Sequence, residues 1–419
     1  MEVSEVRSCR VCGNSDLLPI LSLGVQALSG RFPSRDEPDP PGAPLLLVRC
    51  NDNRNPGACG LLQLQHSVVP DELYLRNYGY RSGMNLTMKL HLKGIVQRAQ
   101  EMIDLHADDA VLDIGSNDAT LLKSYEMPGL QRIGIDPTGQ QFLEHYGRDI
   151  QLVSDYFNAS NYCSASPNKR AKVITSIAMF YDLESPMSFV RDIKQILHPD
   201  GIWVLEQSYM PTMLEMNSFD TVCHEHLEYY ALKQLQWMLK RNGLRMLDVE
   251  FNSINGGSFR ISVCHNDAAL RSSQQRIDLA VSNEENLRLD SERPYREFSE
   301  RVFSIRDQLH GFLTAEKARG KSIYVYGAST KGNVTLQFCG IDHSVITAAA
   351  DRNSEKWGRR TPATDIPIIS EEAAREAKPD YFLVLPWHFR EEFVGREREY
   401  LASGGKFIFP LPEMQIVNG

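Results

Sequence analysis

The sequence predicts an α/β protein in which a small cysteine-containing module precedes two doubly wound sheets. Short apolar runs rich in Val and Ile alternate with helical stretches over residues 110–207, and a second such series follows over residues 321–410. By contrast, residues 1–75 are rich in Pro, Gly and Asn, have poor periodicity and hold four of the eight cysteines. Such a loop-rich unit needs a metal or a covalent link in order to fold.

The elements are expected in a regular order. A helical pattern over residues 85–105 opens the first series, and a helix over residues 233–241 comes before its final pair of strands. Residues 268–318 are polar, charged and free of strand signals, and predict long connecting helices. The strands are expected at 110–114, 131–135, 171–178, 201–207, 245–252 and 258–265, and then at 321–327, 345–351, 381–386 and 406–410.

Composition limits the classes of function. The 419 residues are 42% hydrophobic and 24% charged, as in globular proteins, and are enough for two to three domains. The net charge of −9 argues against a nucleic-acid partner, which needs a basic face. No apolar run reaches the roughly 18 residues that span a bilayer, and the start of the chain lacks a signal-peptide core. We expect a cytoplasmic protein without a membrane partner, whose clustered cysteines bind metal rather than form disulfides.

The loop after the first strand of the first series carries the strongest local signal. Gly115 stands at the tight turn, where a residue without Cβ lets the backbone approach a ligand. Asp136 ends the next strand, so its carboxylate can accept hydrogen bonds from both hydroxyls of a ribose. A helix is expected directly after the loop, over residues 119–126. The residues assigned to a cofactor here are Asp113, Gly115, Ser116, Asn117, Asp118, Asp136, Asp155 and Tyr156.

Two alternatives to this assignment stay open. One is an ordinary tight turn after a strand with a capping Asp. The other is a nicotinamide dinucleotide site, but its fingerprint needs three glycines against a pyrophosphate, and here Gly115 is followed by Asn117 and Ala119. Asp113 and Asp118 would also repel a pyrophosphate, whereas the cationic, phosphate-free S-adenosylmethionine tolerates them. We therefore expect S-adenosylmethionine.

Four cysteines of the N-terminal module are spaced as metal ligands. Cys9 and Cys12 have the C-x2-C spacing of a turn that points two thiolates at one zinc ion. Cys50 and Cys59 lie farther apart than in a standard knuckle, so the loop between them must bulge out. The alternative is free cysteines in a loop. Four thiolates make a closed tetrahedral site, so we predict a structural zinc rather than a catalytic one.

A His-Glu-His segment, residues 224–226, follows the fourth strand of the first series. A histidine can remove a proton near neutral pH, and Glu225 can orient it or contact a substrate hydroxyl. The segment lacks the second helical ligand of an H-E-x-x-H zinc site. The alternative is a helix N-terminal turn with surface histidines. Farther on, the Asn-Gly-Gly-Ser sequence at 255–258 predicts a tight turn before the last strand.

The second series contains a candidate anion site. Residues 327–333 follow a strand, are rich in glycine and carry Lys331, and such a turn binds anions at a helix N-terminus. The turn lacks the order of a Walker A loop. Other cationic residues follow, and the alternative for them is a solvated charged face. They are Arg352, Arg359, Arg360, His388 and Arg390.

Taken together, these motifs resemble one family, the three-domain sugar C-methyltransferases, which act on nucleotide-linked 4-keto-deoxysugars in the biosynthesis of branched antibiotic and cell-surface sugars. The resemblance extends over nearly the whole chain, from the four cysteines to the C-terminal Gly-Ala-x-x-Lys-Gly loop. It implies a Rossmann-like methyltransferase core flanked by a small zinc-binding N-terminal module and a second Rossmann-like C-terminal domain. The implied boundaries are 1–75 for the zinc-binding module, 76–267 for the core, 268–318 for a helical connector and 319–419 for the substrate-binding domain.

The resemblance also implies roles for single residues. His226, at the third position of the His-Glu-His segment, acts as the base, with Glu225 beside the sugar. A tyrosine-rich segment before the core supplies Tyr78 and Tyr80, which line the active site, and one of them or His224 donates a hydrogen bond to an enolate oxygen. The residues assigned to the rest of the acceptor and its nucleotide are Asn255, Lys331, Asn333, Arg352 and His388.

Two positions depart from the family pattern. Cys223 stands where antibiotic-sugar members carry Tyr, so a phenol that could bind the ketone is missing, and Ala119 replaces the last glycine of the cofactor loop. The sequence thus predicts an S-adenosylmethionine-dependent C-methyltransferase that acts next to the carbonyl of a nucleotide-linked ketosugar or a similar small molecule. The alternatives are an O- or N-methyltransferase and a non-catalytic scaffold. Intact Gly115, Asp136 and His226 argue against a scaffold.

Overall fold

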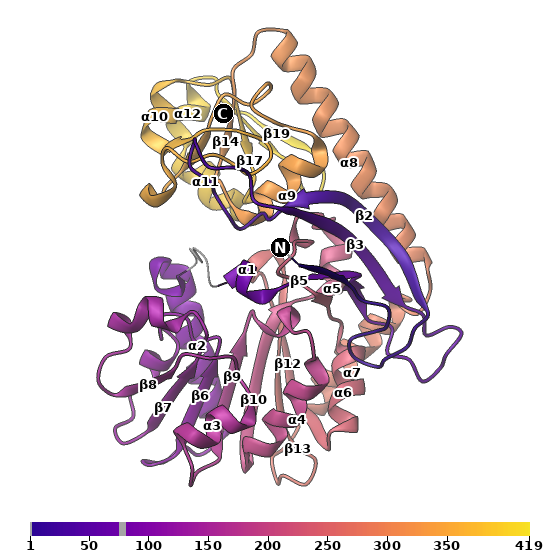
Figure 1. Cartoon of the computed structure of the whole chain (residues 1–419), viewed down its shortest axis with the longest axis vertical. Coiled ribbons are helices and arrows are strands. Elements are labelled where there is room, and N and C mark those ends of the chain that lie inside the picture. Colours follow the sequence, from indigo (N-terminus) through magenta and orange to yellow (C-terminus); the bar gives the residue numbers. More distant parts are fainter. Residues whose placement is uncertain (1, 75–80) are drawn as a thin grey trace.

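Three parts of the chain are arranged one above the other in the computed structural model, which describes residues 2–74 and 81–419. In Figure 1 a seven-stranded sheet lies at one end of the molecule and a six-stranded sheet at the other, with N-terminal strands between them. This is the α/β architecture that the sequence predicts. Among the helices described, none is long and apolar enough to cross a membrane.

The seven-stranded sheet has the strand order β12-β13-β10-β9-β6-β7-β8. From β10 to β8 all neighbours are parallel, whereas β13 is antiparallel to both β10 and β12. The predicted strands of the first series are confirmed, and a further short strand, β8, forms one edge. The bounds are β6 (Ala110–Ile114), β7 (Gln131–Ile135), β8 (Ile150–Val153), β9 (Ala171–Ile177), β10 (Leu197–Ser208), β12 (Leu244–Asn252) and β13 (Ser258–His265).

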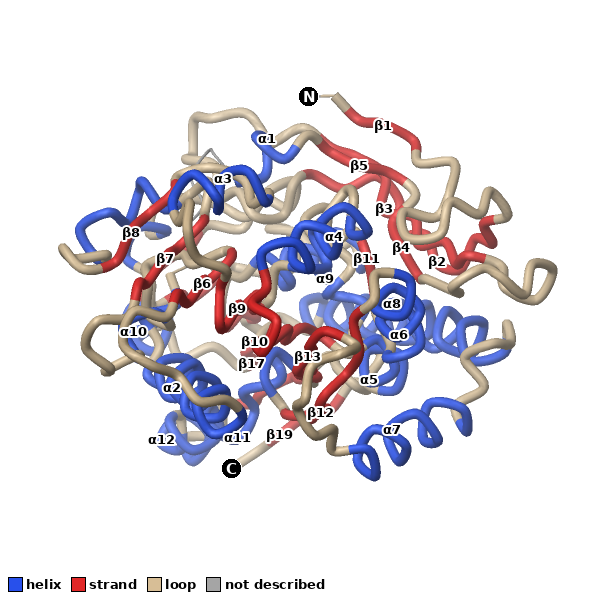
Figure 2. The backbone as a smooth tube through the Cα atoms, turned by 90° about the horizontal axis from the view of Figure 1, so that it is seen from below, coloured by secondary structure: helices blue, strands red, loops and turns tan. Residues whose placement is uncertain are grey.

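Helices cover both faces of this sheet, with α2 on one face and α3 and α4 on the other (Figure 2). Because side chains alternate along a strand, β10 contributes Trp203 and Leu205 to the apolar core on the α4 side and Val204 to the core on the α2 side. The same alternation directs the polar residues at the end of β10 to opposite faces. The helices are α2 (Leu86–Met102), α3 (Ala159–Ala165), α4 (Pro186–Ile196), α5 (Met210–Glu215) and α6 (Leu232–Arg241).

The helix predicted after β6 does not form. The chain leaves β6 through Asn117 and Ala119, whose φ angles of +49° and +60° lie in the left-handed region, and only a single 3-10 turn at Leu122–Ser124 follows. The carboxylate of Asp118 accepts hydrogen bonds from the backbone and the side chain of Thr120, at 3.3 and 2.6 Å. These local bonds offer the backbone an alternative to the helix.

The N-terminal unit is more regular than its composition suggests. β2, β3 and β4 form an antiparallel sheet that β11, from the core part of the sequence, extends. The expectation of a loop-rich unit is wrong because two register shifts in β2, next to Pro19 and Ser22, interrupt the alternation by which a strand is recognised. The bounds are β1 (Val3–Glu5), β2 (Leu17–Ala27), β3 (Gly42–Cys50), β4 (Leu62–Leu64), β5 (His66–Val68), α1 (Pro70–Tyr74) and β11 (Glu228–Tyr229).

Two helices, α7 and α8, lead from the core to the C-terminal sheet. α8 is 26 residues long and runs beside β2 along one side of the molecule (Figure 1). The C-terminal sheet has the order β16-β15-β14-β17-β18-β19 and is parallel except for β19. The strands predicted for the second series are present in it.

The C-terminal part completes the element order. Its strands are β14 (Ile323–Tyr326), β15 (Ala349–Asp351), β16 (Ile368–Ser370), β17 (Tyr381–Val384), β18 (Lys406–Phe409) and β19 (Gln415–Val417). The helices from the connector onwards are α7 (Gln274–Asn286), α8 (Arg293–Ala318), α9 (Thr330–Cys339), α10 (Glu371–Glu376), α11 (Arg390–Arg396) and α12 (Arg398–Ala402).

Candidate active site

One cavity of about 590 Å³ lies where the carboxyl ends of β6, β7, β9 and β10 meet the other two parts of the chain. Its size is that of a small-molecule site. Ten of the residues predicted from the sequence line it, and they come from β6 and the loop after it, the segments after β7 and β8, the His-Glu-His segment, the Asn-Gly-Gly-Ser turn and the start of α9. They are Asp113, Gly115, Ser116, Asn117, Asp136, Tyr156, Glu225, His226, Asn255 and Lys331.

The other predicted residues lie elsewhere. Tyr78 and Tyr80 fall outside the described residues. Six further predicted residues are described but are not among those that line the cavity. They are Asp118, Asp155, His224, Asn333, Arg352 and His388.

The loop after β6 approaches the cavity through its backbone. Gly115 has a φ angle of +73°, and a Cβ added there would come within 3.2 Å of the Met179 side chain. The hydroxyl of Tyr146 lies 2.8 Å from both the Ser116 hydroxyl and the carbonyl oxygen of Asn117, which anchors the loop from below. Glycine is therefore favoured at position 115 both by the positive φ angle and by the close approach of the Met179 side chain.

Asp136 already binds the loop that surrounds it. Its Oδ2 accepts a hydrogen bond from the backbone N–H of Asn117 at 2.7 Å, and its Oδ1 accepts two from Thr138, at 2.6 and 2.7 Å. A carboxylate has about four acceptor positions, so one remains, on Oδ2. In this conformation Asp136 can accept one ribose hydroxyl rather than the pair that the sequence suggests.

Asp113 lies under the same loop. It is buried and accepts a hydrogen bond from the Thr175 hydroxyl at 2.6 Å. Burial raises the pKa of Asp113 to about 7, the Thr175 hydrogen bond opposes this shift, and the charge of Asp136 adds to it. Because Asp113 is partly protonated near neutral pH, it repels the carboxylate of Asp136 less than a fully ionised Asp113 would.

The carboxylates of Asp118 and Asp155 accept hydrogen bonds from backbone N–H groups and do not line the cavity. The Asp118 carboxylate accepts a hydrogen bond from the backbone N–H of Gly83 at 3.0 Å and pairs with Arg81 at 3.5 Å. Asp155 accepts one from the backbone N–H of Tyr156 at 2.7 Å. Asp118 thereby fastens the segment before α2 to the cofactor loop.

His226 is held as a neutral base. Its Nδ1 lies 2.8 Å from the carbonyl oxygen of Thr221, which can only accept, so Nδ1 carries the proton and Nε2 the lone pair. The edge of the ring packs on Tyr181, with centroids 4.5 Å apart. Burial lowers the pKa of His226 to about 4, helped by the charge of Lys331 and opposed by the Thr221 hydrogen bond.

His224 points the other way. Only 3% of it is exposed, and its Nε2 lies 3.0 Å from the carbonyl oxygen of Ala43 in the N-terminal sheet. It therefore links the His-Glu-His segment to β3. Burial lowers the pKa of His224 as well, so that it stays neutral in this contact.

Glu225 faces the cavity where the N-terminal unit comes closest. A Cβ on Gly30 would lie 2.7 Å from Glu225 Oε1, so a larger residue there would displace the Glu225 carboxylate from this position. Cys223, beside it, also lines the cavity, and burial together with the charge of Glu225 raises the pKa of its thiol. The thiol is therefore protonated and acts as a small apolar group at this position.

Lys331 reaches the cavity from the first turn of α9. Its Nζ donates to the backbone carbonyl of Asn255 at 3.3 Å, which ties α9 to the turn before β13. Ser329 caps the helix by accepting a hydrogen bond from the N–H of Gly332 at 3.0 Å. Besides His226, the charge of Lys331 acts on His388, whose pKa burial and Lys331 lower to about 3.

Two other C-terminal residues stabilise the fold. Asn333 is buried, and its Nδ2 donates to the carbonyl oxygen of Ser29 at 2.8 Å. Arg352 lies 3.6 Å from both Glu371 and Glu392. Neither side chain is among the residues that line the cavity.

Glu206 and Gln207 are among the polar residues of the cavity wall that sequence reasoning missed. Glu206 contacts His91 on α2 and accepts a hydrogen bond from Asn252 Nδ2 at 3.0 Å. The signal was present, because two polar residues end an otherwise apolar strand at its carboxyl end, where ligands bind in doubly wound sheets.

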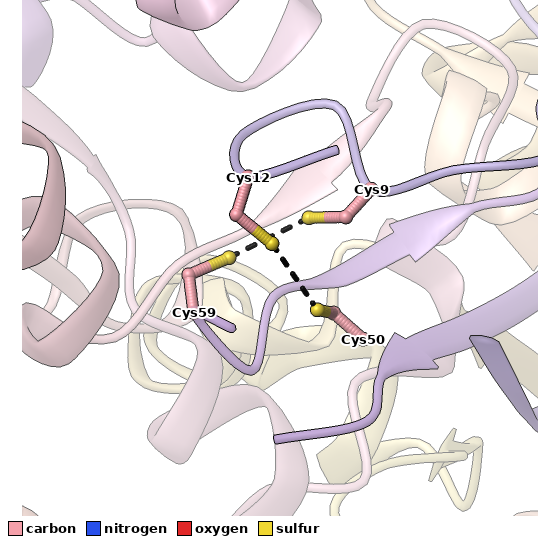
Figure 3. Close-up of side chains that lie close together, drawn as sticks. All are labelled: Cys9, Cys12, Cys50 and Cys59. Carbon is pink, nitrogen blue, oxygen red and sulfur yellow. Dashed lines mark hydrogen bonds between the residues drawn. The ribbon is translucent and has the colours of Figure 1, made fainter. Parts of the chain in front are cut away.

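The four cysteines of the N-terminal unit converge on one point (Figure 3). Their sulfur atoms all lie within 4.8 Å of one another, and the pairs Cys9–Cys59 and Cys12–Cys50 are each 3.5 Å apart. Zn–S bonds of about 2.3 Å imply sulfur atoms roughly 3.8 Å apart in a tetrahedron. The cluster fits a closed zinc site, and the long loop between Cys50 and Cys59 does not prevent it.

Comparisons with known proteins agree with this geometry. Three family models match successive parts of the chain: a zinc binding domain at residues 9–74, a methyltransferase domain at 85–249 and a C-methyltransferase C-terminal domain at 253–412. The C-methyltransferase NovU of Streptomyces niveus is 30% identical over 420 residues, which cover 99% of this chain and 98% of NovU.

Solved methyltransferase structures give matches to part of the chain. The plantazolicin methyltransferase BamL, in complex with a triazolic desmethylPZN analog and SAH, is 12% identical, with a TM-score of 0.35 over 43% of this chain and 87% of BamL. An S-adenosylmethionine-dependent methyltransferase from Clostridium acetobutylicum is also 12% identical, with a TM-score of 0.33 over 42% of this chain and 90% of its own.

The cysteine cluster predicts about one zinc per chain. Replacing both Cys9 and Cys12 by Ser should release the metal and unfold the N-terminal sheet, because a structural zinc contributes folding free energy directly. Elemental analysis and thermal unfolding measure both effects. Cys163→Ser, at an exposed cysteine outside the cluster, should keep the metal. An ordered, metal-free wild-type protein would contradict the assignment.

The remaining acceptor position on Asp136 predicts a role in S-adenosylmethionine binding. Asp136→Ala should weaken binding by about 1.5–3 kcal/mol, the scale of one hydrogen bond to a charged group, or roughly 10- to 100-fold. Calorimetry with S-adenosylmethionine measures this loss. Asp278→Ala, which removes an exposed carboxylate on α7 away from the cavity, should leave the affinity unchanged. Equal losses in the two variants would mean that the ribose lies elsewhere.

Proposed function

This chain belongs to the C-methyltransferase family and uses S-adenosylmethionine, and from this premise we propose that it methylates the carbon next to the ketone of a nucleotide-linked 4-keto-deoxysugar through an enolate. One observation carries the proposal. His226, with its lone pair on Nε2, lines the same cavity as the loop after β6 and as Lys331. A base, a methyl-donor loop and a cation for an anionic group thus face one acceptor.

The chain's own residues would act in a simple sequence. Nε2 of His226 takes the proton of the carbon next to the ketone, and the electrons of that C–H bond form the enolate. S-adenosylmethionine supplies a methyl group already activated by the sulfonium. The residues of the cavity therefore have to align the carbon with the methyl group, remove one proton and stabilise one oxygen anion.

The electrostatics of His226 suit a base that is activated by its substrate. Burial and the charge of Lys331 keep the imidazole neutral in the free enzyme. A diphosphate bound beside Lys331 would offset that charge, which raises the pKa of His226 and makes its Nε2 a stronger base. On this proposal the acceptor's own charge prepares the base that attacks it.

The acceptor would lie across the three parts of the chain. Glu225 is assigned to a sugar hydroxyl, and the N-terminal turn of α9 with Lys331 to the diphosphate, because helix N-termini and ammonium groups bind phosphate oxygens. Asn255, whose carbonyl oxygen accepts a hydrogen bond from Lys331, is assigned to the acceptor as well. Tyr78 and Tyr80 keep the lining role that the resemblance implies. His224, bound to β3, leaves the set of candidate donors.

A labelling experiment tests the function. Protein, methyl-labelled S-adenosylmethionine and 4-keto-deoxysugars linked to different nucleoside diphosphates are incubated together, and NMR locates the label. A new carbon–carbon bond next to the ketone supports the proposal. Label on oxygen or nitrogen, or a product only with acceptors that lack a ketone, would overturn it.

Variants of His226 and His224 should differ in the rate at which they exchange the proton next to the ketone. In deuterated buffer with S-adenosylhomocysteine, which blocks methyl transfer, wild type should exchange the proton next to the ketone. His226→Ala should lower exchange and methylation by two to four orders of magnitude, the usual contribution of a general base, while calorimetry shows unchanged binding of S-adenosylmethionine. His224→Ala should retain measurable exchange. If His226→Ala exchanges at the wild-type rate, the base is another residue.

Lys331 predicts a change in both affinity and pH dependence. Lys331→Met should raise the Michaelis constant for the acceptor more than it lowers turnover, because the diphosphate is remote from the reacting carbon. It should also raise the pKa of His226. A neutral imidazole is needed for activity, so kcat/KM falls as the pH drops through this pKa, and the fall should begin at a higher pH than in wild type. Lys317→Met on α8 is the charge-matched control, with both parameters unchanged.

A further inference from the structure

Gln207 is a buried amide without a partner. Only 1% of the residue is exposed, and neither Nε2 nor Oε1 has a hydrogen-bond partner in the part of the chain that the structure describes. Buried polar groups in native proteins are nearly always satisfied, and an unsatisfied one is destabilising. Contacts within the described chain therefore do not explain why a polar side chain is buried here. Gln207 lines the cavity of the candidate active site, where a ligand can supply the missing partner.

Other buried glutamines of the chain show the contrast. Gln234 accepts a hydrogen bond from the N–H of Ala231 at 3.0 Å and donates to the carbonyl oxygens of Cys59 and Gly60, both at 3.1 Å. Gln63 likewise accepts from the N–H of Arg10 at 2.9 Å. Gln26, also buried, is bonded on one side only: its Nε2 donates to the carbonyl oxygen of Leu23 at 3.4 Å, and its Oε1 has no described partner. Among the buried glutamines of the described residues, Gln207 is the one whose amide has no partner on either side.

The strand directs Gln207 to the face of the sheet opposite α2. Gln207 stands near the carboxyl end of β10, opposite Phe259 of β13. Strand alternation places it on the face of Trp203 and Leu205, whereas Glu206 turns to His91 on the α2 face. His226 and Cys223 line the same cavity as the amide.

The reaction needs a donor at this place. When the proton leaves carbon, negative charge gathers on the former ketone oxygen, and a fixed hydrogen-bond donor there lowers the barrier. The ring N–H groups of the two histidines are already engaged, because His226 Nδ1 donates to the carbonyl oxygen of Thr221 and His224 Nε2 faces that of Ala43. Gln207 Nε2 carries two N–H donors that no described residue uses.

We propose that Gln207 is a catalytic residue whose Nε2 donates to the ketone oxygen of the acceptor and stabilises the enolate. The proposal rests on the proposed function. The proton passes from the α-carbon to His226 Nε2, the electron pair moves onto the oxygen that Gln207 holds, and it returns to form the new carbon–carbon bond. The C–S bond breaks with its electrons remaining on sulfur, and His226 later releases its proton to solvent.

Two substitutions test the role. Gln207→Met keeps the length of the side chain and removes both polar atoms, and Gln207→Leu removes them with a shorter, branched side chain. Both should slow α-proton exchange of a 4-keto-deoxysugar nucleotide, measured with S-adenosylhomocysteine in deuterated buffer, by about 10²- to 10³-fold. The affinity for S-adenosylmethionine should stay within about twofold of wild type in calorimetry.

Stability provides a second readout with opposite sign. Gln207→Met removes unsatisfied buried atoms, so its melting temperature should equal or exceed that of wild type. Gln234→Met, the matched control at a fully bonded glutamine, should melt at a lower temperature and keep the exchange rate of its folded fraction. A glutamine with only a structural role would give the second pattern at position 207.

The outcomes are distinct. Exchange within a few-fold of wild type in either Gln207 variant, loss of cofactor affinity in proportion to activity, or failure of both variants to fold overturns the inference. If wild type itself exchanges no α-proton and methylates no ketosugar, the proposed function fails instead. Slow exchange with intact folding and cofactor binding supports the assignment.

Discussion

The pairing of β11 with the N-terminal sheet is the contact on which the arrangement of the site depends. The backbone N–H of Leu64 donates to the carbonyl oxygen of Leu227 at 2.9 Å, and Leu227 donates in turn to Tyr181 at 2.8 Å. His226 directly precedes this pairing. His226 is thus fixed between β4 of one unit and the loop after β9 of another. Gly30 lies against Glu225, and His224 contacts Ala43 of the same N-terminal unit, so the folded N-terminal unit holds this wall of the cavity in place.

Burial then sets the chemistry of the groups that this pairing brings together. His226 is neutral because its charged form would be poorly solvated and would face the charge of Lys331. Asp113 is partly protonated because burial disfavours its charged form too. The thiol of Cys223 is protonated by the same effect. His226 and Cys223 therefore add no charge to the cavity wall, whereas Lys331 brings a positive charge to it.

Local sequence patterns predicted the parts of the fold that depend on neighbouring residues. The strands of both parallel sheets, the turn at Gly115 and the cysteine cluster follow from apolar runs, a glycine and a C-x2-C spacing. The N-terminal sheet could not be predicted, because its fourth strand is supplied by residues 228–229, far along the chain, and bulges disturb its pattern. Likewise, no local signal tells His224 from His226. Their opposite directions are decided by the carbonyl groups of Ala43 and Thr221, which only the folded chain brings near. Gln207 could be suspected from its place at a strand end, but its lack of partners appears only in the folded structure.

The single long helix α8 sets a length scale for the whole site. A helix rises about 1.5 Å per residue, so its 26 residues extend over roughly 39 Å beside β2, between the two large sheets. The C-terminal sheet carries α9, and with it Lys331, at the far side of the cavity. Deletion of one turn of α8 would shorten the helix by about 5.4 Å, more than the reach of a hydrogen bond. The placement of Lys331 relative to the first sheet therefore depends on a helix that has no residue in the cavity.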